Sequence, residues 1–222
     1  MINWNLLTEI GNIVVTGALA LIIAVWFLLE ARWKLAWEWC LVFGGGMFVV
    51  LLTKFAFVGW GIGSETLDFT GLSGHAMRAM CGLPVLGFLL FYHAHSRLRQ
   101  LALLAMLLLA GLISYSRLVV HAHSVSEVLS GAGFGLLLGA VFMRRVGLAQ
   151  RFRFNQALVL VSLLGLLLSH RAAPVATQNM LIELTLKITH HPRPFTRLGW
   201  HFDPYYCVEP EPGKTTFCRH YP

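Results

Sequence analysis

Long apolar runs separated by short polar segments constrain the fold of this chain more than any other feature. They cover Ile13–Leu29, Trp39–Thr53 with a continuation from Phe55 to Trp60, Ala79–Tyr92, Leu101–Tyr115, Val128–Met143 and Ala157–Ser169. A helix needs about 20 mostly apolar residues to cross a bilayer, whereas a barrel strand needs about ten that alternate. The runs are too long for barrel strands, so we expect helices whose polar flanks complete the shorter spans.

The composition agrees with a membrane protein. Of the 222 residues, 57% are hydrophobic and 12% are charged, and the four cysteines are too few for a disulfide scaffold. A soluble globular domain carries about twice this share of charge, and a disordered chain is less apolar. We therefore predict an all-α fold, with a six-span transmembrane helical bundle in residues 1–170 and a small extracytoplasmic tail in residues 171–222.

The basic residues between the runs are unevenly distributed. They follow the first, third and fifth runs: Arg32, Lys34, Arg97, Arg99, Arg144, Arg145, Arg151 and Arg153. The segment from Gly61 to Ser73 has none. Cytoplasmic loops collect Lys and Arg, so we expect the basic loops inside, and both termini and the other loops outside. This placement accounts for the net charge of +7 without a nucleic-acid partner.

The tail has its own patterns. Ile182–Thr189 alternates strictly between apolar and polar residues, which predicts a half-buried strand. Cys207 and Cys218 lie close to the C-terminus, where an extracytoplasmic location permits a disulfide. The alternative is a zinc site formed by these cysteines with histidines of the tail, although no tight ligand spacing supports it. The histidines are His190, His191 and His201.

Ionisable residues at membrane depth are costly and call for an explanation. Five of them fall at the predicted outer ends of the second to fifth spans: Lys54, His75, Arg78, Arg117 and His123. Glu127 follows His123 by four residues, which on a helix places the two side chains on one face. A carboxylate there can hold one ring nitrogen and leave the other free to attack. The alternative is a buried ion pair that only joins helices.

The neighbouring residues favour an anion. Ser73 and Gly74 precede an apolar helix, whose free N–H groups and dipole attract negative charge. Arginine binds phosphate oxygens through two parallel bonds, and two histidines supply a nucleophile and an acid. These residues predict a phosphoryl-transfer site that needs no metal and no other cofactor.

At this point the sequence resembles a known family, the type 2 phosphatidic acid phosphatases. Ser116-Arg117, His123 and Glu127 are similar to its third signature, Ser-Arg, five residues, His, three residues, Asp, with Glu127 in the Asp place. Leu72-Ser73-Gly74-His75 is similar to the second signature, Pro-Ser-Gly-His. The first signature is Lys, six residues, Arg-Pro; Lys54 matches its lysine, but Gly61-Ile62 replaces Arg-Pro.

The resemblance implies roles for these residues. His123 would form a phosphohistidine, Glu127 would orient it, and His75 would protonate the leaving oxygen. Lys54, Arg117 and the backbone of Ser73 and Gly74 would hold the phosphate. His121 would either narrow the pocket or be a spectator.

Arg78 follows His75 by three residues, so on a helix it shares the face of His75. We expect Arg78 to replace the missing arginine of the first signature. The alternative is that its side chain extends to outer head groups.

The expected protein is thus a metal-independent lipid phosphatase of the bacterial inner membrane, with its site on the periplasmic side. Its partners would be the bilayer and a lipid phosphate or pyrophosphate. Undecaprenyl pyrophosphate, phosphatidic acid and phosphatidylglycerol phosphate are all candidates by resemblance. A lipid phosphotransferase using the same phosphohistidine, or a non-catalytic lipid-binding relative, are the alternatives.

Overall fold

The computed structural model describes residues 4–148, 154–169, 177–190 and 193–197, and within them the chain is helical. The helices are α1 (Trp4–Ile10), α2 (Ile13–Leu29), α3 (Trp33–Trp60), α4 (Gly74–Leu90), α5 (Ser96–Val119), α6 (Val125–Leu148), α7 (Gln156–Ser169) and α8 (Thr177–Thr189). The predicted all-α class is confirmed for these residues. Their only β pairing is an isolated bridge between Ser64 and Phe69.

Helices long and apolar enough to cross a bilayer account for most of the bundle. Within the described residues they are Leu7–Leu29, Trp33–Trp60, Ser96–Val119 and Val125–Leu148. Two further apolar helices, Gly74–Leu90 and Ala157–Leu166, are shorter. The chain is thus a helical membrane protein, and the count of six spans stays a prediction.

Exposed tryptophans lie near both ends of α3. The side chains of Trp33 and Trp37 are 67% and 66% exposed at its start, and Trp60 is 54% exposed at its end. Tryptophan is enriched where a membrane meets water, because its ring is apolar and its N–H is polar. The length of α3 therefore suits a helix that reaches from one interface to the other.

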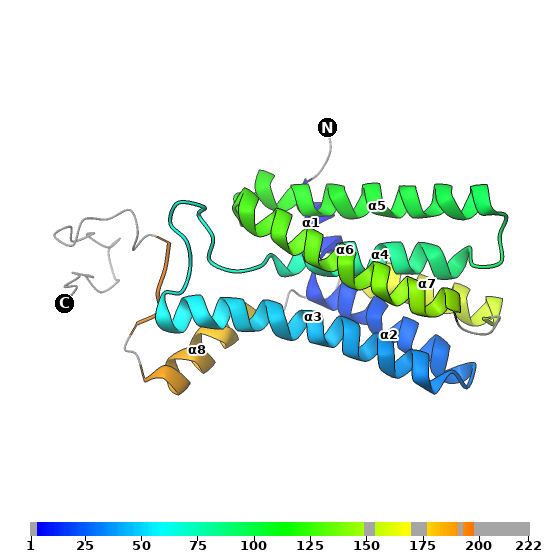
Figure 1. Ribbon diagram of the computed structural model, residues 1–222, viewed down its shortest axis with the longest axis horizontal. Coiled ribbons are helices and arrows are strands. Elements are labelled where there is room, and N and C mark those ends of the chain that lie inside the picture. Colours follow the sequence, from blue (N-terminus) through cyan, green and yellow to red (C-terminus); the bar gives the residue numbers. More distant parts are fainter. Residues whose placement is uncertain (1–3, 149–153, 170–176, 191–192, 198–222) are drawn as a thin grey trace.

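The long helices run roughly antiparallel, so their connections gather at two opposite ends of the bundle (Figure 1). The turns at residues 30–32 and 91–95 and the end of α6 lie at one end, which we call the basic end because Arg32, Arg97 and Arg144 lie there. The loop 61–73 and the turn 120–124 lie at the other, which we call the site end. The sequence-based separation of the basic loops from the candidate site is thus present in the fold.

A seam of glycines brings α6 unusually close to α4. A Cβ atom added to Gly131 would lie 2.6 Å from the Ser73 carbonyl oxygen, and one on Gly135 would lie 2.2 Å from the Met77 carbonyl oxygen. Gly139 continues the row one turn later, 3.0 Å from the Cys81 carbonyl oxygen by the same measure. Small residues at every fourth position let helix backbones touch. This seam fixes the start of α4 against the first turns of α6.

The strand predicted for Ile182–Thr189 is wrong, because these residues belong to α8. In a helix, residues four positions apart share one face, so a pattern that repeats every two residues also repeats along that face. In α8 that face is the buried one. Thr185 and Thr189 lie on it, and their methyl groups would be 3.0 and 2.8 Å from a Cβ on Gly59 of α3. Each threonine hydroxyl donates to the carbonyl oxygen four residues earlier, so neither polar group opposes burial.

Other expectations for the tail lie outside the described residues. These are the Cys207–Cys218 disulfide and the zinc alternative, of which only His190 is described. The remaining cysteines, Cys40 and Cys81, are free thiols on α3 and α4.

The glycine seam yields a stability prediction with a control on the same helix. Gly135→Ala should lower the free energy of unfolding by about 2–3 kcal/mol, because the new methyl group meets backbone that cannot move aside. Gly133 has no atom within 4 Å of an added Cβ. Gly133→Ala should therefore be neutral or stabilising by up to about 1 kcal/mol, since alanine favours a helix over glycine. Thermal unfolding in detergent micelles, followed by circular dichroism, measures both. Equal effects of the two variants would contradict the seam.

Candidate active site

The residues singled out from the sequence come together at the site end. Lys54 comes from α3, the Ser73–Arg78 segment from the start of α4, Arg117 from the last turn of α5, His123 from the turn after it, and Glu127 from the first turn of α6. His75 interacts electrostatically with groups from three other segments, namely Lys54, Arg117 and His123. Three stretches distant in sequence, at residue 54, residues 73–78 and residues 117–127, thus contribute to one charged cluster.

The contact between His123 and Glu127 is present. The His123 Nδ1 atom lies 2.7 Å from the Glu127 Oε2 atom, and the two side chains are 11% and 1% exposed. The prediction erred in placing both residues on a helix, since α6 begins at Val125. His123 is held instead by the turn, where its N–H donates to the Arg117 carbonyl oxygen at 3.3 Å.

A capping box sets the position of Glu127. The Ser124 hydroxyl accepts from the Glu127 N–H at 3.3 Å, and the Ser124 N–H donates back to Oε2 of Glu127 at 3.4 Å. This reciprocal arrangement is typical of Ser-x-x-Glu at a helix start. The sequence therefore contained a signal for the start of α6 and for the direction of this carboxylate.

Burial and charge keep His123 neutral. Desolvation of the ring lowers the pKa of His123, and this outweighs the hydrogen bond to Glu127, which raises it. The cations Lys54 and Arg117 lower the pKa further. Because Nδ1 donates its hydrogen to Glu127, the Nε2 atom carries the free lone pair, and within the described residues nothing is bonded to it. His123 thus offers a nucleophilic nitrogen.

The start of α4 offers fewer backbone donors than the sequence implied. The Ser73 N–H donates to the Glu127 carbonyl oxygen at 3.0 Å, so it is not available to a phosphate. The Ser73 hydroxyl caps the helix by accepting from the Ala76 N–H at 3.5 Å. The N–H groups of Gly74 and His75 have no acceptor among the described residues. The open donors of this helix start are therefore those of Gly74 and His75.

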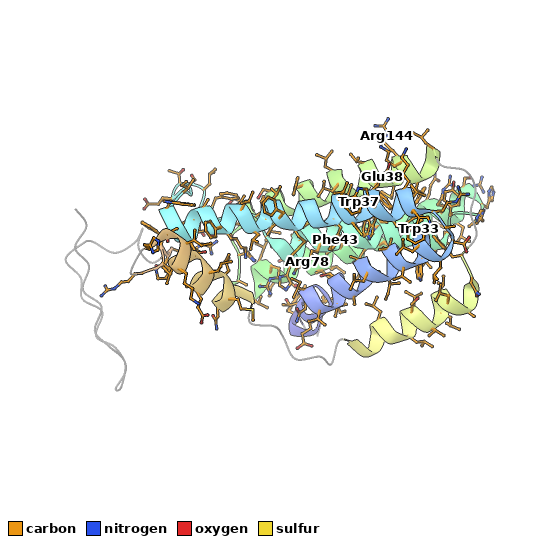
Figure 2. All side chains as sticks on the ribbon, turned by 90° about the horizontal axis from the view of Figure 1, so that it is seen from below. Trp33, Trp37, Glu38, Phe43, Arg78 and Arg144 are labelled. Carbon is orange, nitrogen blue, oxygen red and sulfur yellow. The ribbon has the colours of Figure 1, made fainter. Side chains whose placement is uncertain are left out.

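Arg78 lies inside the bundle, nearer the site end than Arg144 (Figure 2). Only 6% exposed, it donates from Nε to the Thr16 hydroxyl at 2.9 Å and from Nη2 to the Gly11 carbonyl oxygen at 3.2 Å. The alternative in which it extends to head groups is therefore wrong. Its Nη1 atom would lie 2.9 Å from a Cβ on Gly74, so the glycine makes room for the guanidinium.

Two cations of the cluster have uncompensated donors. The Nε atom of Arg117 is buried and has no hydrogen-bond partner among the described residues. Lys54 of α3 interacts electrostatically with Glu127, Arg78 and Arg117, and no described group accepts a hydrogen bond from it. Buried polar groups are almost always paired, so an unpaired guanidinium N–H marks a place for a ligand. The ligand that fits both groups is an anion.

Two partners of Glu127, Thr70 and Arg197, were not singled out from the sequence, nor was Asp68, which pairs with Arg197. Thr70 donates its N–H to Oε1 at 2.8 Å and its hydroxyl to the same oxygen. Arg197 Nη2 lies 2.6 Å from Oε2, and Arg197 Nε lies 3.1 Å from Oδ1 of Asp68. Thr70 and Asp68 come from a loop, and Arg197 from beyond α8, so no periodic pattern indicated them.

Two other groups do not join the site. His121 is exposed and its backbone has a positive φ of 53°, which supports the spectator interpretation.

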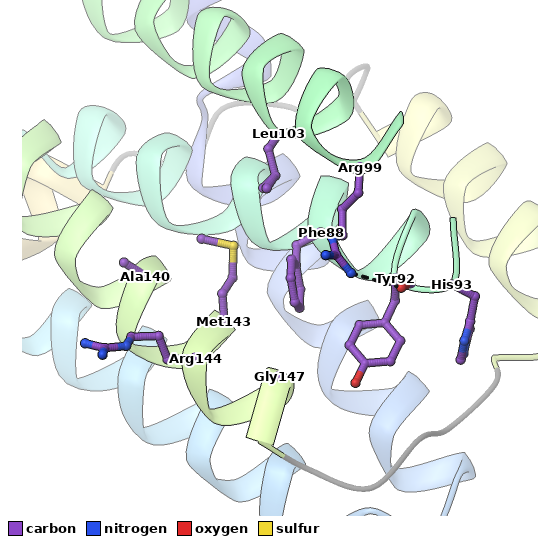
Figure 3. A pocket seen from close by; sticks show the side chains of 9 residues that line it. All are labelled: Phe88, Tyr92, His93, Arg99, Leu103, Ala140, Met143, Arg144 and Gly147. Carbon is purple, nitrogen blue, oxygen red and sulfur yellow. Dashed lines mark hydrogen bonds between the residues drawn. The ribbon is translucent and has the colours of Figure 1, made fainter. Parts of the chain in front are cut away.

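A cavity of about 740 Å³ lies at the basic end, lined by the end of α4, the start of α5 and the end of α6 (Figure 3). Its polar lining residues are Tyr92, His93, Arg99 and Arg144. Within the described residues, no three His, Cys, Asp or Glu side chains are grouped as a metal site requires.

The geometry predicts that the length of Glu127 matters. Glu127→Asp should lower kcat by about 100-fold, because a carboxylate withdrawn by roughly one ångström no longer holds the ring in place. This is expected although aspartate is what the resembled signature has. Glu127→Gln should cost about 10⁴-fold, since the amide favours the wrong tautomer of His123. Turnover of a lipid phosphate by purified variants measures both. Full activity of Glu127→Asp would show that the longer side chain is not required.

Comparisons with known proteins agree with the geometry. The family model described as PAP2 superfamily matches residues 53–151, which include the whole cluster except Arg197. An uncharacterized 22.5 kDa protein in the cps region of Klebsiella pneumoniae is 34% identical over 209 residues, covering 90% of this chain and 98% of that protein. Phosphatidylglycerophosphatase B of Bacillus subtilis is 35% identical over 73 residues, covering 32% of this chain and 36% of that protein. No solved structure matches. On its family match and on the signatures gathered at one site, the chain belongs to the PAP2 superfamily.

Proposed function

We propose that this protein is a membrane lipid phosphatase that hydrolyses a phosphate or pyrophosphate monoester of a lipid by transferring the terminal phosphoryl group to His123, which forms a phosphohistidine. Its membership of the PAP2 superfamily and its likeness to a phosphatidylglycerophosphatase support a phosphatase-type lipid enzyme. The observation that carries the proposal is the juxtaposition of a neutral, oriented imidazole with the unpaired donors of Arg117. A nucleophile beside an anion site is what phosphoryl transfer needs.

In the first step, Arg117, Lys54 and the N–H groups of Gly74 and His75 bind the phosphate oxygens. The His123 Nε2 lone pair attacks the terminal phosphorus as the bond from phosphorus to the leaving oxygen breaks. His75 gives its proton to that oxygen, and the leaving group departs as the lipid alcohol from a monophosphate or as the lipid phosphate from a pyrophosphate. The negative charge of the bound phosphate offsets the surrounding cations and so favours the protonated form of His75.

In the second step, water replaces the lipid. His75, now unprotonated, takes a proton from the water as its oxygen attacks phosphorus. The bond between phosphorus and Nε2 breaks, and inorganic phosphate and the neutral His123 are regenerated. Glu127 holds Nδ1–H throughout and stabilises the positive charge on the ring. If an alcohol entered in place of water, the same steps would describe a phosphotransferase.

Arg78 is a weaker candidate for a phosphate clamp. Its Nε and Nη2 atoms donate to Thr16 and Gly11, and its Nη1 atom, close to the start of α4, donates to the Met47 sulfur at 3.7 Å. We infer that Arg78 contributes charge to the site and fixes the α1–α2 junction against α4. The proposed mechanism uses no metal ion, since Lys54, Arg78 and Arg117 already supply the positive charge that a divalent cation would bring.

The nucleophile can be tested with a matched control two residues away. His123→Asn should lower phosphate release by about 10⁴-fold or more, because the attacking nitrogen is lost. His121→Asn should have no effect, and asparagine tolerates the positive φ of that position. Free phosphate and new lipid species are scored with undecaprenyl pyrophosphate, phosphatidic acid and phosphatidylglycerol phosphate, with and without a chelator.

Several results would contradict this assignment. Substantial turnover by His123→Asn would exclude the phosphohistidine. Loss of wild-type activity in the chelator would overturn metal independence. A new phosphorylated lipid with little free phosphate would identify a transferase instead, and inactivity on all three lipids would favour a non-catalytic relative.

We further propose that the site end faces the periplasm of a bacterial inner membrane. The basic end carries arginines that cytoplasmic loops collect, whereas the loop 61–73 has no Lys or Arg. The substrate would then be a lipid whose phosphate reaches the outer leaflet.

The orientation predicts the behaviour of introduced cysteines. Cys40, Cys207 and Cys218 are first replaced by alanine, which leaves only the buried Cys81, and one cysteine is then placed at Ser64 or at Ser96. A reagent that cannot cross the inner membrane should label Ser64→Cys in whole cells and label Ser96→Cys only after lysis. The reverse pattern would place the active site on the cytoplasmic side.

A further inference from the structure

The residues beyond α8 reach the candidate site although they lie outside the family match, which ends at residue 151. Phe195 donates its N–H to the Val58 carbonyl oxygen of α3 at 3.0 Å. Its ring covers Gly61, where an added Cβ would lie 2.9 Å from the Phe195 Cδ1 atom. The segment 193–197 is therefore docked on the end of α3 by both its backbone and a side chain.

The docking place coincides with the departure from the first signature. Gly61 stands where that signature has arginine, and here it ends α3 with a left-handed φ of 69°. A side chain at this position would be strained and would displace Phe195. Gly59, two residues earlier, receives Thr185 and Thr189 of α8. Glycines at the end of α3 thus make room for both α8 and Phe195.

Two residues after Phe195, Arg197 reaches the carboxylate of the site. Its Nη2 atom lies 2.6 Å from Oε2 of Glu127, the same oxygen that holds His123 at 2.7 Å. Its Nε atom lies 3.1 Å from Oδ1 of Asp68. The side chain of Arg197 is 30% exposed, so the guanidinium closes the outer side of the Glu127 carboxylate. His123 and Arg197 therefore bind one oxygen atom from two sides.

We propose that the segment 193–197 completes the active site. In it, Phe195 is the anchor at Gly61 and Arg197 is a positioning residue for Glu127 and His123. This inference rests on the proposed function. Arg197 fixes the carboxylate that orients the ring, and it neutralises the carboxylate charge. Without Arg197, the full charge of Glu127 would favour the protonated imidazole, which cannot attack phosphorus.

The other titratable groups that face His123 are not carboxylates, so none of them favours the protonated ring as Glu127 does. They are Lys54 on α3, His75 on α4 and Arg117 on α5. None of these three forms a hydrogen bond or an ion pair with the Glu127 carboxylate. Removal of Arg197 therefore changes the balance at His123 in one direction, toward protonation.

Four variants of the full chain test the proposal. Arg197→Ala should lower kcat by about 10- to 100-fold with KM changed by less than about twofold, since orientation and not substrate binding is lost. The acid limb of the pH profile of kcat/KM should move to higher pH, because a raised pKa of His123 means that the ring loses its proton only at higher pH. Arg197→Lys should restore the position of the acid limb, because the lysine keeps the positive charge. It should recover kcat only in part, because an ammonium lacks the two-pronged geometry of a guanidinium. Phe195→Ala should resemble Arg197→Ala, and the double variant should be no worse than either alone.

Lys187→Ala is the matched control, because it removes one positive charge from an exposed position on α8 of the same segment. It should leave kcat and the acid limb unchanged. A loss of kcat in Arg197→Ala with an unmoved acid limb, or additive effects of Phe195→Ala and Arg197→Ala, would overturn the proposal. A raised KM at constant kcat would also overturn it, since Arg197 would then bind substrate directly.

A second measurement separates this inference from the proposed function. Titration of ¹⁵N-labelled histidine in detergent micelles reports the pKa of His123 without any turnover, and His123→Asn identifies its signal. The pKa of His123 should be higher in Arg197→Ala than in the wild type and in Lys187→Ala. An unchanged pKa in Arg197→Ala would refute the positioning role even if no lipid phosphate were hydrolysed. Active wild-type enzyme with an unaffected Arg197→Ala variant would refute it while leaving the proposed function intact.

Discussion

A carboxylate removed from water must be surrounded by donors, and at the site end that carboxylate is Glu127, which is 1% exposed. Thr70 from the loop before α4 holds Oε1, while His123 and Arg197 hold Oε2. The Glu127 carbonyl oxygen accepts from the Ser73 N–H, so the backbone of the same residue fixes the start of α4. Three separate segments are therefore oriented by the need to satisfy one residue, and the position of the His123 ring follows from all of them.

This network depends on how closely two helices approach. The Ser73 N–H reaches the Glu127 carbonyl oxygen because Gly131 leaves the Ser73 carbonyl in contact with α6. The row Gly131, Gly135 and Gly139 extends that approach along the bundle, away from the polar cluster. The packing that stabilises the membrane helices and the geometry that places His75 near His123 thus have a common origin.

Sequence reasoning identified the residues of this site but not all of their contacts. The spacing of His123 and Glu127 was informative because the capping box at Ser124 keeps both near the first turn of α6. Ile182–Thr189 was misassigned because its alternation fits a strand and also fills one helical face, and only the contact with Gly59 decides between them. The partners of Arg78 lie in the turn between α1 and α2, on α2 and on α3, and Arg197 lies beyond α8, so no local pattern related them to the site. Long-range contacts of single polar side chains leave no period in a sequence.

The distribution of charge gives these distant contacts a common consequence. Arg197 faces two carboxylates, Glu127 and Asp68, so its charge is compensated within the protein. Arg78 is bonded to neutral oxygens, and the buried Nε of Arg117 has no partner among the described residues. The Glu127 carboxylate interacts with Lys54 as well as with Arg197, but one carboxylate cannot offset the charges of Lys54, Arg78 and Arg117 together with that of Arg197. A cluster of buried cations is costly to hold together, and an arriving phosphate relieves the repulsion while gaining their donors. For the proposed lipid phosphate substrate, binding energy is thereby concentrated on the phosphate group, and the lipid chain contributes mainly by bringing that group to the bilayer surface.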